Sequence, residues 1–142
     1  MAKSIQTEIS IAAPRARVWT VLMDFARYPE WNPFIRRLQG APRVGETLDA
    51  FIQPPAHKIS RFRPRVVEID SERTFAWRGA LPIPGLFTGV HRFALGDEAG
   101  GTRFEQSEDF SGLLVPLFGS ILTATELGFK NMNAALKVRS ES

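Results

Sequence analysis

The stretch GLFTGVHRFALGDEAGGTRFEQSEDF, residues 85–110, predicts an antiparallel β-hairpin. On both sides of a glycine-rich segment, large apolar residues recur at every second position, which is the period of a strand with one buried face. With a turn at residues 97–100, the aromatic residues of both strands fall on the same face, and this agreement supports the register. The expected cross-strand pairs are Leu95 with Thr102, Phe93 with Phe104, His91 with Gln106, Gly89 with Glu108, and Phe87 with Phe110.

Three polar residues, His91, Gln106 and Glu108, interrupt this aromatic face. In the expected register His91 and Glu108 are diagonal neighbours, within reach of two long side chains. Burial of an imidazole, an amide and a carboxyl group is costly unless they bond to each other, to water or to a ligand. The residues alone leave three interpretations open: a self-satisfied polar network in a filled core, a strand end open to solvent, or the wall of a ligand cavity.

The order of elements along the chain predicts an α+β domain. Alternating isoleucines in residues 5–11 indicate a first strand, and Pro14 stands where a short helix begins. A second short helical segment is expected before Pro33, and six strands joined by short turns are expected between about residues 34 and 110. Short turns in place of crossover helices indicate an antiparallel sheet, curved around a terminal helix.

That terminal helix is expected at residues 117–139, where apolar residues recur every three or four positions. Its inward face is expected to carry Phe118, Ile121, Phe129 and Met132. A glycine on or beside this face would let the helix approach other backbone closely.

Composition limits the classes of protein to which the chain can belong. Its 142 residues suit one domain, expected over residues 1–142, and a net charge of +3 is too small to indicate a nucleic-acid partner. The absence of cysteine excludes disulfide frameworks and thiolate metal sites, and it fits a cytoplasmic location. The densest basic cluster is expected to be a solvated sheet face, because three of its members share strand parity. This cluster consists of Lys58, Arg61, Arg63 and Arg65.

The sequence contains no motif for a cofactor or a metal ion. It has no dinucleotide fingerprint, no P-loop and no GxSxG nucleophile motif. Its two histidines, His57 and His91, are too few and too far apart to indicate an iron site. We therefore expect no cofactor and no metal, and no apolar stretch indicates stable membrane insertion.

Five stretches carry a resemblance to a known family: residues 13–35 (APRARVWTVLMDFARYPEWNPFI), 63–79, 89–95, 101–116 and 128–137. They resemble the START-related helix-grip (SRPBCC) superfamily, and within it the polyketide cyclase/dehydrase and lipid-transport branch. The resemblance implies a helix-grip fold in which a seven-stranded curved antiparallel sheet wraps around the long C-terminal helix. It also implies two short helices after the first strand and an elongated apolar cavity between sheet and helix.

The resemblance favours the cavity interpretation of the aromatic face. It also implies that Tyr28, Trp31 and Asn32 lie near the cavity entrance. The candidate ligand-binding residues are Trp31, Trp77, Phe87, Gly89, His91, Phe93, Phe104, Gln106, Glu108, Phe110, Phe118, Ile121 and Phe129.

Three functions are open at this point. The first is a carrier or sensor that binds a hydrophobic small molecule, lipid-like, aromatic or polyketide-like, because the expected wall is aromatic with few polar groups. The second is a polyketide cyclase/dehydrase-like enzyme that uses His91 and Glu108 for proton transfer. The third is a protein-interaction module, for which only the basic cluster offers support. The ligand and the oligomeric state are not specified by the sequence.

Overall fold

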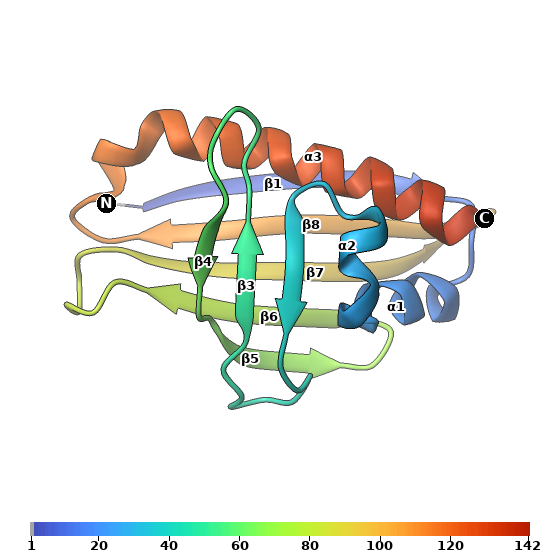
Figure 1. Cartoon of the computed structure of the whole chain (residues 1–142). Helices are drawn as coiled ribbons and strands as arrows, with labels where there is room; N and C mark the ends of the chain where they lie inside the picture. The colour runs from blue at the N-terminus through green and yellow to red at the C-terminus, as the bar shows by residue number, and fades with distance from the viewer. Residues whose placement is uncertain (1) are drawn as a thin grey trace.

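The expected hairpin is present and forms the middle of the structure (Figure 1). The computed structural model describes residues 2–142. Its two longest strands, β7 (Thr88–Glu98) and β8 (Gly101–Ser111), pair antiparallel along their whole length. The hairpin prediction is therefore confirmed in its position and direction.

The register of the hairpin differs from the expected one by two residues. Glu98 pairs with Gly101, so the turn consists of two residues where four were expected. Gly100 in this turn has a φ of +83°, a conformation that favours glycine and closes a tight turn. Because two residues are one side-chain period of a strand, the shift leaves the same residues on the inner face. It places His91 directly opposite Glu108, not diagonal to it.

The hairpin belongs to a five-stranded antiparallel sheet in the order β1-β8-β7-β6-β5. β1 (Ala2–Ile11) pairs with β8, β6 (Thr74–Ala80) pairs with β7, and β5 (Arg65–Asp70) forms the far edge. In Figure 1 these strands form the rear layer of the molecule.

A second sheet of three strands crosses in front of the first (Figure 1). It consists of β2 (Ile35–Gln39), β3 (Asp49–Ile52) and β4 (Ser60–Phe62). The expectation of one seven-stranded sheet is therefore wrong, since the described residues form eight strands in two sheets. Pro64, which has no N–H for a strand ladder, separates β4 from β5 where the chain passes from one sheet to the other.

Three short helical segments follow β1, where two were expected. They are α1 (Arg15–Met23), the 3-10 turn η1 (Phe25–Arg27) and the single-turn helix α2 (Tyr28–Trp31). Pro14 caps α1 from outside in the extended conformation and does not form its first turn.

The long C-terminal helix α3 (Gly119–Glu141) runs alongside β1 and closes the upper edge of the molecule in Figure 1. A 3-10 turn, η2 (Val115–Phe118), leads into it. Phe129 and Met132 are fully buried, as expected for the inward face. A side chain at Gly128 would collide with the ring of Phe34, so this glycine makes room for the Phe34 side chain just before β2 and not for a neighbouring backbone.

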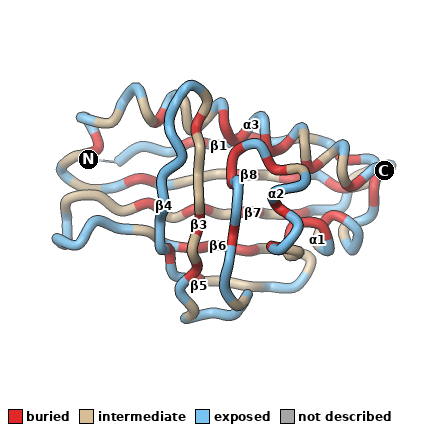
Figure 2. Tube along the Cα trace, viewed as in Figure 1, coloured by how far each residue is buried: buried red, intermediate tan, exposed pale blue. Residues whose placement is uncertain are grey.

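The packed core fills the end of the structure that carries α1 and α2, where Figure 2 shows buried segments of α1, both sheets and α3. A row of aromatic rings crosses it: Phe25 stacks on Phe75 at 5.7 Å, Phe75 on Phe93 at 5.7 Å, and Phe93 on Phe104 at 6.1 Å between centroids. Such contacts add to the stabilisation that burial provides. Within residues 2–142, no helix combines the length and apolarity that a membrane crossing requires.

Candidate ligand-binding cavity

A cavity of about 620 Å³ lies between the two sheets and the beginning of α3. Its walls come from β3 and β4 on one side, from β6, β7 and β8 on the other, and from η2 and α3 at the edge. Most of its lining is apolar or aromatic, and its volume falls in the range of sites for drug-sized molecules.

The structure brings eight of the thirteen predicted residues to this cavity. They occupy the ends of β6, β7 and β8 that point away from the packed core, and the junction of η2 with α3. These eight residues are Trp77, Phe87, Gly89, His91, Glu108, Phe110, Phe118 and Ile121.

Four predicted residues lie behind the cavity wall. Phe93, Phe104, Gln106 and Phe129 are fully buried and belong to the packed half of the structure. The alternation of the two strands places them on the inner face, as expected, but other side chains fill the space in front of them. Strand parity alone does not distinguish a filled part of a face from a hollow one.

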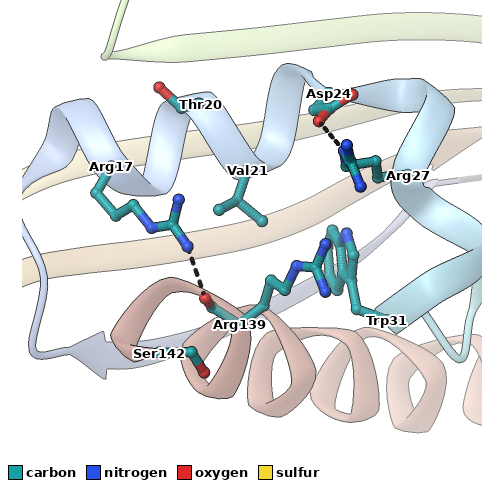
Figure 3. Close-up of a pocket in the computed structure, with 8 residues that line it drawn as sticks. All are labelled: Arg17, Thr20, Val21, Asp24, Arg27, Trp31, Arg139 and Ser142. Carbon is teal, nitrogen blue, oxygen red and sulfur yellow. Dashed lines mark hydrogen bonds and ion pairs between the residues drawn. The ribbon is translucent and has the colours of Figure 1, made fainter.

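Trp31 lies at a different pocket, of about 370 Å³, between α1, α2 and the C-terminal end of α3 (Figure 3). The side chains of Tyr28 and Asn32, which were also expected near the entrance, hydrogen-bond to the backbone. The Tyr28 hydroxyl donates to the carbonyl of Leu22 at 2.6 Å, and burial raises the pKa of Tyr28 well above its usual range. Asn32 Oδ1 accepts hydrogen bonds from the backbone N–H of Phe34 and Ile35. None of these three residues lines the 620 Å³ cavity.

The second pocket is lined by three arginines whose side chains are already engaged (Figure 3). Arg17 donates to the carbonyls of Arg139 and Ser140, at 3.2 and 3.3 Å. Arg27 and Arg139 both pair with Glu30, at 3.1 and 2.8 Å. We interpret this pocket as part of the interface at which ion pairs and hydrogen bonds connect the short helices to α3.

His91 and Glu108 meet in the cavity wall. The Nδ1 atom of His91 lies 3.5 Å from Oε1 of Glu108. The His91 side chain is only 2% exposed, whereas that of Glu108 is 16% exposed and reaches the cavity. Rings of Trp77, Phe93 and Phe129 surround the imidazole, with centroids 4.5 to 5.0 Å away, so it has little freedom to turn.

A buried hydrogen-bond chain begins at the other nitrogen of the imidazole. His91 Nε2 lies 2.9 Å from Gln106 Oε1, and Gln106 Nε2 donates to Asn133 Oδ1 at 2.8 Å. Asn133 Nδ2 donates to the hydroxyl of Thr7 at 2.9 Å, and that hydroxyl donates to the carbonyl of Gln106. The network thus satisfies buried amide groups on β8 and α3 and connects the cavity wall to β1.

The direction of the hydrogen bonds in this network determines which nitrogen of the imidazole carries a proton. The carbonyl of Phe129 can only accept, and it lies 3.4 Å from Gln106 Nε2, so the NH₂ group of Gln106 points towards α3. Its oxygen therefore faces His91, and Nε2 must carry a hydrogen. Nδ1 is left as the atom that faces Glu108.

Gly89 makes room for the Glu108 carboxyl group. A Cβ atom at this position would collide with Oε2 of Glu108 and crowd the ring of Phe110. The glycine therefore permits the position of Glu108 beside His91. On the neighbouring strand β6, Trp77 pairs with His91, and Gly79 is the partner of Gly89.

Sequence reasoning missed the wall formed by the β3–β4 hairpin. The signal was weak but present: Ser60 and Phe62, the two β4 residues of parity opposite to Arg61, line the cavity, and Arg63 also reaches it where the chain leaves β4. Arg61 pairs with Asp49 at 2.9 Å, and Arg63 approaches the same oxygen at 3.5 Å. Residues 2–142 hold no group of three metal-ligating side chains.

The chain belongs to the polyketide cyclase/dehydrase and lipid transport family, whose model matches residues 2–141. This match confirms the family resemblance noted in the sequence and, with the architecture described above, the helix-grip fold. A search of curated proteins found no match to the chain.

Solved structures share this fold. The Zhui aromatase/cyclase from Streptomyces sp. R1128 matches with a TM-score of 0.78 and 16% identity, over 99% of this chain and 94% of that one. The di-domain aromatase/cyclase StfQ of the steffimycin pathway matches with a TM-score of 0.71 and 14% identity, over 100% of this chain and 53% of its own. Ara h 8.0201 matches with a TM-score of 0.64 and 16% identity, over 96% and 98%. The chain spans about half the length of StfQ and of a second di-domain protein, BexL.

Proposed function

We propose that the protein binds a hydrophobic small molecule in the 620 Å³ cavity and acts as a carrier or sensor. The observation that carries this proposal is the composition of the wall, in which aromatic and aliphatic side chains surround the polar pair of the buried His91 and the partly exposed Glu108. An apolar wall gains free energy when it exchanges water for a ligand, and a few polar groups orient that ligand. The family description, which names lipid transport, is consistent with this function.

Ile121 offers a direct test of the site. It lines the cavity from α3, so an Ile121→Trp variant is expected to occupy the ligand space. Leu127, on the same helix but 50% exposed, provides the matched control as Leu127→Trp. We expect an environment-sensitive apolar dye to bind the wild type and the control at micromolar concentration and to bind Ile121→Trp at least tenfold more weakly. Equal dye affinity in the two variants would place the site elsewhere.

A second candidate function is a cyclase- or dehydrase-like proton transfer on a polyketide-like ligand, favoured by the contact between His91 Nδ1 and Glu108 in the cavity wall. One group would take a proton from a carbon next to a ligand carbonyl, and the other would return a proton to an oxygen. Turnover that disappears in Glu108→Gln while dye binding remains would favour this function over the carrier. Absence of turnover in the wild type with retained binding would favour the carrier.

A further inference from the structure

The positively charged groups that line the cavity come from one short segment, residues 57–63, which contains β4. This segment contributes Lys58 and Arg63 to the wall, together with the imidazole of His57. Residues 50–64 contain no aspartate or glutamate, so the segment has no carboxylate of its own.

Lys58 differs from the neighbouring arginines in its partners. Arg61, on β4, does not line the cavity and is neutralised by Asp49 at 2.9 Å. Arg63 shares the same Asp49 oxygen at the longer distance of 3.5 Å, and its side chain is 66% exposed. Lys58 is exposed at the cavity rim and has no acidic partner among residues 2–142.

The negative charge of the wall lies elsewhere and has a partner. Glu108 is the one acidic residue among the described lining residues. It lies on the five-stranded sheet, across the cavity from β4, and contacts His91 on the neighbouring strand. The cavity therefore has a cationic rim on the β3–β4 side and an apolar interior whose carboxyl group is already engaged. A ligand anion is attracted to the rim and disfavoured next to Glu108.

We propose that the ligand is an amphipathic anion, with its apolar body inside the cavity and a carboxylate at the rim against Lys58, assisted by Arg63. This inference rests on the proposed function, because it assigns the ligand class of the same cavity. Lys58 then sets specificity for acids over uncharged molecules of equal length. An ammonium group on a flexible stem suits this role, since it can follow head groups of different reach.

The test compares dodecanoate with 1-dodecanol as displacers of the bound apolar dye at low ionic strength. We expect the wild type to bind dodecanoate more tightly than 1-dodecanol. Lys58→Met is expected to weaken dodecanoate binding about fivefold and to leave 1-dodecanol within twofold, the scale of one exposed ion pair. Arg61→Met is the matched control, because it removes one positive charge from the same segment at a residue that pairs with Asp49 and does not line the cavity. Both affinities are expected to stay within twofold in this variant.

Three results would overturn this inference. One is equal binding of the acid and the alcohol by the wild type, and another is unchanged dodecanoate affinity in Lys58→Met. The third is an equal loss in Arg61→Met, which would indicate general surface charge. In each case, the proposed function is still supported if Ile121→Trp blocks dye binding and Leu127→Trp does not. If the dye does not bind the wild type, the proposed function fails together with the inference.

Discussion

His91 and Glu108 stand directly opposite each other on β7 and β8, with Nδ1 and Oε1 3.5 Å apart in the wall of the cavity. This contact lies between a buried hydrogen-bond network and the open cavity. Behind His91 lies a fully bonded polar chain that ends at β1, and in front of Glu108 lies the hollow between the sheets. The pair is therefore held from one side and accessible to a ligand from the other.

Gln106 is expected to set the tautomer of His91. In Gln106→Leu the acceptor of the Nε2 hydrogen disappears, so the population of the two neutral tautomers should shift, and ¹⁵N–¹H correlation spectra of the imidazole report this shift. We also expect a loss of about 1–3 kcal/mol in the free energy of unfolding, because Asn133 loses its donor.

Thr7→Val is the matched control for this experiment. It removes the far end of the same hydrogen-bond chain but leaves the carbonyl of Phe129 to orient Gln106. Stability should fall while the His91 tautomer stays as in the wild type. A tautomer that is unchanged in Gln106→Leu, or altered in Thr7→Val, would contradict the assignment.

Gly89→Ala is expected to move the Glu108 carboxyl group away from His91. The new Cβ would occupy the position of Oε2, so the carboxyl group must rotate into the cavity. We expect altered imidazole NMR shifts of His91 and at least threefold weaker dye binding. Gly79→Ala is the control, because Gly79 pairs with Gly89 across β6 and β7, lines the same cavity, and has open space around its Cβ position. Matching effects in both variants would show that Glu108 is not the group displaced.

Phe129 and Phe118 should separate the packed core from the cavity. Phe129 is fully buried on α3, so Phe129→Ala is expected to lower the free energy of unfolding by about 3–5 kcal/mol. Phe118 is half-buried at the cavity edge, and Phe118→Ala should cost only about 1–2 kcal/mol. Urea denaturation measures both values. A loss below about 1 kcal/mol for Phe129→Ala would contradict its position in the packed half.

The ion pairs at the second pocket predict a response to acid. A hydrogen bond from Arg139, aided by the charge of Arg27, holds the pKa of Glu30 below its usual range. The pKa of Glu30 is lower in the folded than in the unfolded chain, so its stabilising contribution is present above the unfolded pKa. The contribution is lost as pH falls through the folded pKa.

Carbon NMR titration of the Glu30 carboxyl group measures this shift. In Arg139→Gln its midpoint should rise towards that of an ordinary glutamate, and added salt should reduce the wild-type shift because the pair is exposed. Glu141, whose pKa is lowered mainly by a hydrogen bond from Lys137, serves as an internal control that should not respond to Arg139→Gln. A Glu30 midpoint that is the same in both proteins would contradict the ion-pair assignment.

The sequence by itself determined which residues of the central hairpin face inward. His91, Gln106 and Glu108 share one face with the phenylalanines because strand parity is local and survives a two-residue shift in register. It also determined the final helix and its buried residues Phe129 and Met132, because helical periodicity is equally local.

The tertiary structure decided everything that depends on contacts between distant segments. The turn length, and with it the direct opposition of His91 and Glu108, depended on pairing along the whole of β7 and β8. Whether the inward face is filled depended on other elements. At one end Phe25 stacks on Phe75, which stacks on Phe93, whereas a cavity remains over Gly89 at the other end. Periodicity reports only that a side chain turns inward, and packing between distant elements decides what, if anything, occupies the space in front of it.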